Sequence, residues 1–121
     1  MAQGINRSRK DDNQDAIVEA LEAAGCKVQS LAGVGRGCPD LLVATGNLVT
    51  AGDIGHPWVI IEVKDGAKSP SERKLTPKEL VWHKKFNYFA PVWVVYDEIG
   101  ALWVCGKTSE VPKIKPIRMV E

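Results

Sequence analysis

Long apolar runs, paired cysteines and a strong net charge are all missing from this chain of 121 residues. No apolar run approaches the roughly 20 residues of a membrane span, and the polar N-terminus differs from a signal peptide. We therefore expect a cytoplasmic protein without membrane contact. The three cysteines are widely spaced and lack the CxxC or Cys/His pattern of a zinc site, so we expect reduced thiols. The net charge of +1 excludes no class of function.

What is present fits one globular domain. Apolar residues make up 45% of the chain and charged residues 26%, which is ordinary for a protein with a hydrophobic core. Residues 1–10 are polar and basic, so we expect a disordered arm there. Residues 11–121 show neither a linker nor an internal repeat, and we expect them to form a single domain.

The most informative segment is the apolar run Trp58–Ile61, which leads into Glu62, Val63 and Lys64. This run predicts a buried strand, on which Glu62 and Lys64 share one face because side chains alternate. The alternative is an ion pair on a solvated edge strand, which is common and worth only ~0–1 kcal/mol. The apolar residues before Glu62 favour burial, where charged groups need a partner or a metal.

A third charged residue, Asp40, precedes another apolar run, Leu41–Ala44. Alone, an aspartate after proline is typical of a turn. If the two strands lie side by side, however, Asp40, Glu62 and Lys64 meet in one place. Carboxylate oxygens suit Mg²⁺, and a neighbouring lysine can hold or activate a water. The combination favours an active site.

Three blocks of sequence resemble the PD-(D/E)XK nuclease superfamily, in particular its small VRR-type (VRR-NUC) domains and phage-type Holliday junction resolvase-like proteins. The blocks occur in the family's order and are Gly35–Val43, Ile60–Lys64, and Leu75–Pro77 followed by Trp82 and His83. The similarity extends over roughly residues 11–98. It implies an α/β fold with a restriction-endonuclease-like core, in which helices flank a mixed central sheet.

The resemblance also implies a chemistry, the Mg²⁺-dependent hydrolysis of DNA phosphodiester bonds, with Mn²⁺ as a substitute. Asp40, Glu62 and the Val63 carbonyl would bind the metal, and Lys64 would orient the attacking water. Standalone relatives cut branched DNA such as four-way junctions, often as dimers. A homodimer is therefore one expectation, with the apolar segments 92–95 and 102–104 as candidate surfaces.

Two positions depart from the family pattern. Relatives often carry a metal-binding glutamate on the first helix, where this chain has Gln14 on the predicted core-facing side. The ligand is then absent, neutral, or supplied by Asp15. Relatives usually have glutamine where this chain has Glu79, which is either a helix-capping residue or an aid to metal binding.

Periodicity and capping signals predict the remaining elements. Asn13 is the expected N-cap of the first helix, and Thr76 with Glu79 forms a capping box for the second. The glycines of residues 33–37 predict a loop able to approach a phosphate closely. The expected helices are 13–24 and 76–88, and the expected strands are 27–31, 41–44, 48–51, 58–65, 92–96 and 102–105, with a loop at 66–74 and an extended tail.

Basic residues gather after the proposed site. From Lys64 to Lys85 there are seven basic residues and three acidic ones, a net of +4. Such runs are usually solvated surface, but here their position favours contact with the DNA backbone. The candidates are Arg36, Lys68, Arg73, Lys74 and Lys78, with Arg7, Arg9 and Lys10 as an alternative track.

Other candidate residues carry weaker signals. His83 is a less favoured general base than Lys64, and Trp82 and Phe86 are expected in the core. Cys38 is the only cysteine whose modification is expected to affect activity. Two rival functions stay open: a DNA-binding module that has lost catalysis, and an accessory subunit of a phage or prokaryotic DNA-processing assembly.

Overall fold

A computed structural model describes residues 11–47 and 57–118 of the chain. The expected strand at 48–51 and the expected arm at 1–10 lie outside these residues. The elements run, in chain order, α1 (Gln14–Ala23), β1 (Lys27–Ser30), β2 (Leu41–Ala44), β3 (Trp58–Val63), the 3₁₀ helix η1 (Pro70–Arg73), α2 (Pro77–Phe86), β4 (Val92–Val95), α3 (Glu98–Val104) and β5 (Ile117–Arg118).

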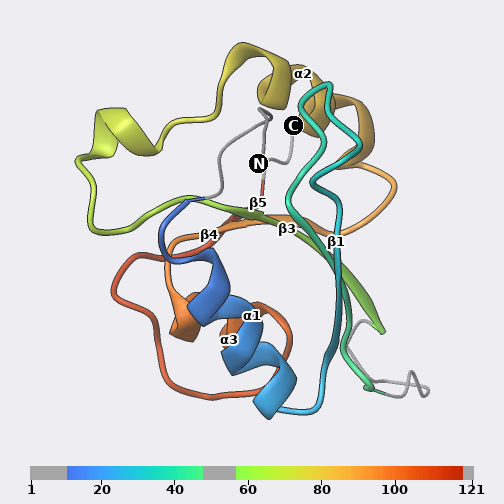
Figure 1. Cartoon of the computed structure of the whole chain (residues 1–121), viewed down its shortest axis with the longest axis vertical. Helices are drawn as coiled ribbons and strands as arrows, with labels where there is room; N and C mark the ends of the chain where they lie inside the picture. Colours follow the sequence, from blue (N-terminus) through green and yellow to red (C-terminus); the bar gives the residue numbers. More distant parts are fainter. Residues whose placement is uncertain (1–10, 48–56, 119–121) are drawn as a thin grey trace, which may run out of the picture.

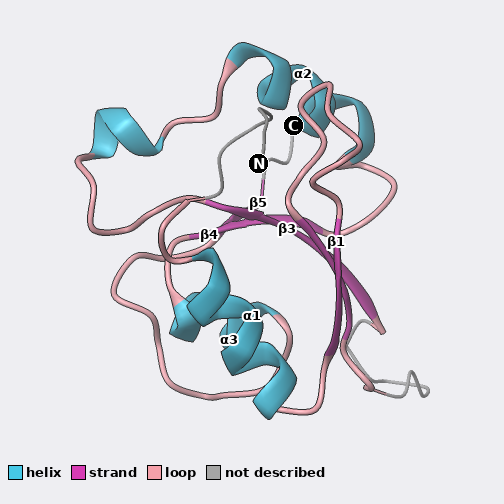
Figure 2. Ribbon diagram, viewed as in Figure 1, coloured by secondary structure: helices cyan, strands magenta, loops and turns pink. Residues whose placement is uncertain are grey.

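The strands form one mixed sheet in the order β1-β2-β3-β4-β5. β3 and β4 are parallel and α2 lies in the connection between them, whereas the other neighbours are antiparallel. Helices α1 and α3 cover one face of the sheet and α2 lies over the other (Figure 1, Figure 2). The predicted α/β fold, a mixed central sheet flanked by helices, is confirmed.

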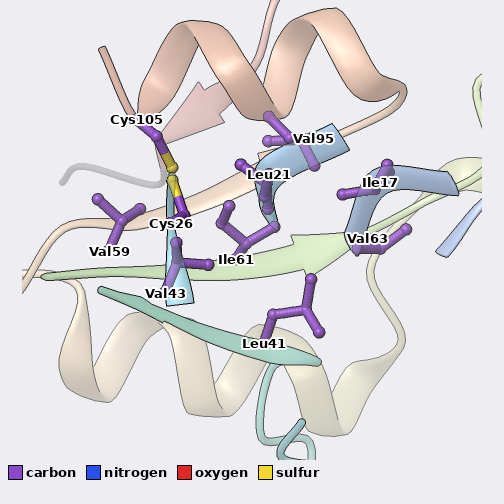
Figure 3. Close-up of a cluster of buried hydrophobic side chains, with 11 residues drawn as sticks. Ile17, Leu21, Cys26, Leu41, Val43, Val59, Ile61, Val63, Val95 and Cys105 are labelled. Carbon is purple, nitrogen blue, oxygen red and sulfur yellow. The ribbon is translucent and has the colours of Figure 1, made fainter. Parts of the chain in front are cut away.

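The hydrophobic core lies between the sheet and the pair α1 and α3 (Figure 3). Alternate residues of β2 and β3 point into it and are shielded from water, a gain of about 1.5–3 kcal/mol per large side chain. Because side chains alternate, the intervening residue Glu62 is directed toward α2. The buried side chains drawn there include Ile17, Leu21, Leu41, Val43, Val59, Ile61, Val63 and Val95.

Two cysteines face one another within this core (Figure 3). Cys26 and Cys105 are free and buried, and burial is the main cause that raises the pKa of both thiols, that of Cys105 to about 12. Burial, followed by the charges of Glu62 and Asp40, likewise raises the pKa of Cys38. Because the thiolate is the reactive form, all three are expected to be unreactive at neutral pH.

The expected strand at 102–105 is wrong. Residues 102–104 belong to α3 and Cys105 is its C-cap; the helix begins after Asp97, whose side chain accepts a hydrogen bond of 2.7 Å from the Gly100 amide. A short apolar run fits a strand or a buried helix equally well, and the N-cap decides between them. Val92–Val95 is β4, an interior strand, so neither segment provides the edge expected for a dimer.

Smaller corrections concern the ends of elements. The side chain of Asn13 does not cap α1; its amide donates to the carbonyls of Lys64 at 3.3 Å and Tyr96 at 3.0 Å. Asn13 thus ties the start of α1 to the ends of β3 and β4. The expected loop at 66–74 contains η1, and the expected extended tail returns as β5 to pair with β4. Within the described ranges, no helix is long and apolar enough to cross a membrane.

Candidate active site

A cleft of about 440 Å³ opens beyond the C-terminal end of β3. The start of α1, the glycine-rich loop before β2, the end of β3 and the first turn of α2 form its walls. The predicted residues that line it are Gln14, Arg36, Asp40, Glu62, Lys64, Lys78 and Glu79.

The pairing of β2 with β3 places Asp40 beside the end of β3. Leu41 lies opposite Ile61 in the antiparallel register, and the Asp40 amide donates to the Ile61 carbonyl at 3.1 Å. The Val63 amide in turn donates to Asp40 Oδ2 at 2.7 Å. The first contact fixes the backbone of Asp40, and the second holds its carboxyl group at the end of β3.

The carboxyl groups of Asp40 and Glu62 both line the cleft and affect one another's pKa. Burial raises the pKa of Glu62 to about 10, and the nearby charge of Asp40 adds to this effect. Burial also raises the pKa of Asp40, although the Val63 amide opposes the shift. At neutral pH Glu62 therefore holds a proton beside Asp40, and a cation bound between them would replace that proton.

Lys64 forms an ion pair with Glu79 across the cleft, with 2.8 Å between Nζ and Oε1. The same carboxylate oxygen accepts the Thr76 amide at 2.8 Å, so the predicted capping box is present and Glu79 also binds the lysine. Burial lowers the pKa of Lys64, but the hydrogen bond and charge of Glu79 outweigh it, and the pKa is raised. Lys64 is consequently a fixed cation at neutral pH, and not a base.

His83 reaches Glu62 from α2, with 3.3 Å between Nε2 and Oε1. Burial lowers the pKa of His83 and raises that of Glu62, so this contact is a hydrogen bond between neutral groups. None of the His83 side chain is exposed, which leaves it without the solvent access that a general base for water requires. Its position is suited to orienting Glu62.

The aromatic neighbours of His83 lie nearer the surface than the sequence indicates. Trp82 stacks on Phe86 with ring centroids 4.2 Å apart. Phe86 is 37% exposed, so its expected place in the core is wrong. The cause is the helical spacing, which turns residues 82 and 86 away from the buried face of His83.

The start of α1 places the side chain of Gln14 in the cleft and that of Asp15 outside it. Gln14 is 4% exposed and lines the cleft, whereas Asp15 is exposed and does not. Sequence reasoning missed Asp11, which lines the cleft one turn before Gln14. Burial raises the pKa of Asp11, against the attraction of Lys64 and Lys68. No local pattern marks Asp11, because only the docking of α1 places it there.

The five residues expected to contact DNA fall into separate groups. Arg36 and Lys78 line the cleft, and Lys68 reaches its edge, 3.8 Å from Asp11. Arg73 and Lys74 line a different cavity of about 450 Å³, where the Arg73 guanidinium lies 5.6 Å from the Tyr96 ring centre. Arg73 also donates to the Lys68 carbonyl at 2.9 Å, so contacts within the chain occupy it.

The glycine-rich loop packs against the first turn of α2. Gly37 has φ +80°, and a Cβ atom there would overlap the backbone carbonyl of Lys78. This close approach explains why the position is glycine. The preceding Arg36 adopts φ 59°, a conformation that residues with a Cβ rarely take. The loop thereby places Arg36 along the cleft wall.

The donor atoms suit a hard cation. Within the described residues, no group of three or more His, Cys, Asp and Glu side chains is arranged to hold a metal ion. The carboxyl groups of Asp40 and Glu62 line the cleft and offer oxygen donors, and the Val63 carbonyl stays a predicted ligand. Mg²⁺ is usually held by one or two carboxylates and keeps several waters, so these residues fit it and do not fit zinc.

Carboxylates and a lysine at the ends of neighbouring strands in a mixed α/β sheet define a restriction-endonuclease-like, nuclease-type domain. No protein-family profile matches the chain, and no curated protein does. A solved structure described as a VRR_NUC domain is 30% identical, with a TM-score of 0.53, and the match covers 77% of this chain and 89% of that one. The chain belongs to the VRR-NUC family, as the resemblance in its sequence predicted.

Proposed function

We propose that this protein hydrolyses phosphodiester bonds of DNA with the help of Mg²⁺, for which Mn²⁺ can substitute. The observation that carries the proposal is the convergence of Asp40, Glu62 and Lys64 on one cleft. Two further cations, Arg36 and Lys78, line the same cleft and supply charge for a phosphate backbone.

Each residue has a distinct task in this proposal. Asp40, oriented by the Val63 amide, and Glu62, after it loses its proton, would hold the metal together with the Val63 carbonyl. When bound, the metal polarises the scissile phosphate and lowers the pKa of a bound water. Lys64 remains charged and stabilises the negative charge that develops on the phosphate, while Glu79 fixes its position.

The cations that line the cleft suit recognition of the shape of DNA and not of its base sequence. Lysine and arginine side chains that contact phosphates position the duplex but carry no sequence information. We therefore propose selectivity for branched substrates such as flaps and four-way junctions. Sedimentation of the complex measures whether one or two copies of the chain bind a junction.

The test is cleavage of linear, nicked, flapped and four-way DNA with Mg²⁺, Mn²⁺ or EDTA. Wild-type protein should give products only with the metals. Asp40→Asn should lose metal binding, and Lys64→Ala should retain it but cleave roughly 10²–10³-fold more slowly. Lys27→Ala is the control, because Lys27 is exposed and pairs with Ala44 at the end of β2 opposite to Asp40. Wild-type rates in Lys64→Ala would refute the assignment of the site.

A second candidate is a DNA-binding module with little catalysis. It is favoured by one contact, the ion pair that engages Lys64 with Glu79. Such a module would bind DNA equally well with EDTA and yield no product with any metal. The same set of reactions therefore separates the two functions.

A further inference from the structure

The outward face of α2 exposes apolar side chains that the fold does not use. Val81 is 69% exposed, and beyond the helix end Tyr88 is 74% and Phe89 85% exposed. The opposite face buries His83 and Asn87 at 0% and 4% exposure. Large apolar side chains exposed near one another on one element often mark a binding site.

This face begins at the cleft. Lys78 lines the cleft and, with Arg36, Pro77 and Val81, also lines an adjoining hollow of about 360 Å³. Residues 78, 81, 85 and 88 follow helical spacing, so they form one stripe along α2. The helical turn continues past Phe86, where the Asn87 amide donates to His83 and the Phe89 amide to Phe86. The stripe is thus ~15 Å long.

The charge of the face points to an anionic partner. No aspartate or glutamate occurs between Leu80 and Tyr96, whereas Lys84 and Lys85 are both exposed. Lys85 Nζ lies 5.5 Å from the centre of the Phe86 ring. Lysines interleaved with exposed rings are the composition that binds a nucleic-acid strand, through phosphates and stacked bases. A second copy docked symmetrically would instead bring these lysines near their own counterparts.

We propose that this face holds an unpaired strand of the substrate where it leaves the cleft. Tyr88 and Phe89 stack on its bases, and Lys84 and Lys85 contact its phosphates. The inference rests on the proposed function of the cleft and narrows the substrate class to DNA with a single-stranded arm. Stacking on exposed rings is tolerant of sequence, in agreement with recognition by shape.

The test measures binding in EDTA by fluorescence anisotropy, with a duplex carrying a single-stranded arm and a blunt duplex of equal length. The double variant Tyr88→Ala with Phe89→Ala should bind the armed duplex at least about fivefold more weakly and the blunt duplex within about twofold of wild type. Tyr88→Trp, which retains a ring, should preserve binding. Trp58→Ala is the matched control, because Trp58 is 56% exposed and starts β3, the strand whose other end carries Glu62.

Three results would overturn the inference: an unchanged affinity for the armed duplex, an equal loss of affinity for both duplexes, or a wild-type dimer that the double variant converts to monomer in sedimentation. Cleavage by wild-type protein with Mg²⁺ tests the proposed function separately. If the protein binds the arm through these rings but cuts no DNA, the proposed nuclease function is refuted and the strand-binding role of this face stands. If the protein cuts DNA and the double variant binds the armed duplex as wild type does, only the strand-binding role of this face is refuted.

Discussion

Lys64 on the end of β3 and Glu79 in the first turn of α2 form an ion pair of 2.8 Å that spans the cleft. The pair joins the strand that carries Glu62 to the helix that carries His83. Glu79 occupies the place where the family resemblance implies glutamine. This chain therefore carries an extra negative charge beside the cations that we propose bind phosphate, and the charge holds the lysine in one position.

Glu79→Gln tests the purpose of that charge. The glutamine oxygen can still accept the Thr76 amide, so the cap of α2 should survive, while the negative charge disappears from the cleft. We expect DNA to bind severalfold more tightly and the pKa of Lys64 to fall. Affinity and cleavage rate together are the measurement, and Thr76→Ala, which weakens the cap without changing charge, is the control. Loss of Mg²⁺ binding in Glu79→Gln would instead show that Glu79 helps to hold metal.

Glu62→Gln is expected to stabilise the metal-free protein. The folded pKa of Glu62, about 10, lies above its ordinary 4.5, so the folded state binds the proton more tightly than the unfolded state. Its contribution to stability is complete below pH 4.5 and decreases as pH rises toward 10. Glutamine cannot ionise, so at pH 8 the variant should gain up to roughly 5 kcal/mol in free energy of unfolding, because each pH unit above 4.5 costs the wild type about 1.4 kcal/mol.

Urea unfolding at pH 5 and pH 8 in EDTA measures this difference. The gain should shrink at pH 5, because this pH lies close to the ordinary pKa of 4.5, so ionisation of the unfolded carboxyl group favours unfolding much less than at pH 8. Added Mg²⁺ should stabilise wild-type protein and leave Glu62→Gln unaffected, because the variant lacks a ligand. A variant less stable than wild type at pH 8 would contradict the proton assignment.

His83 is predicted to act through Glu62. His83→Leu removes the hydrogen bond to Glu62 Oε1, and removal of such an orienting partner typically weakens metal binding about 10–100-fold. His83→Gln should retain most of the affinity, because its amide can donate or accept at a similar distance. Calorimetric titration with Mg²⁺ or Mn²⁺, beside thermal unfolding of both variants, is the measurement. Equal affinities for the two variants would show that His83 only fills space.

Much of the fold and the central part of the site could be predicted from local signals. The apolar runs before Glu62 and after Asp40 specify β3 and β2, and the Thr76–Glu79 capping box marks the start of α2. Local signals do not predict contacts between segments that are far apart in the chain. His83 and Glu62 are 21 positions apart in the chain, and their contact depends on how α2 docks on the sheet. The position of Asp11 in the cleft has the same origin.

The basic residues show that a run of charges in the sequence does not predict which side chains line the cleft. Arg73 and Lys74 belong to the region predicted as a loop, where no periodicity indicates direction, and the structure turns them toward Tyr96 and away from the cleft. Arg36, in contrast, precedes the run in sequence and lies at the cleft with Lys78. Proximity along the chain to Lys64 therefore does not predict which basic residues line the cleft.

Two double variants make this division testable. Arg36→Ala with Lys78→Ala should weaken binding to duplex DNA of any sequence and lower the salt slope by roughly 0.9 for each phosphate that the protein no longer neutralises. Arg73→Ala with Lys74→Ala removes the same formal charge from the other cavity and should leave the slope nearly unchanged. Affinity measured across a range of salt concentrations separates the two, because net charge alone predicts equal effects. A larger decrease of the slope in the second variant would place the DNA along the Arg73 side and not across the cleft.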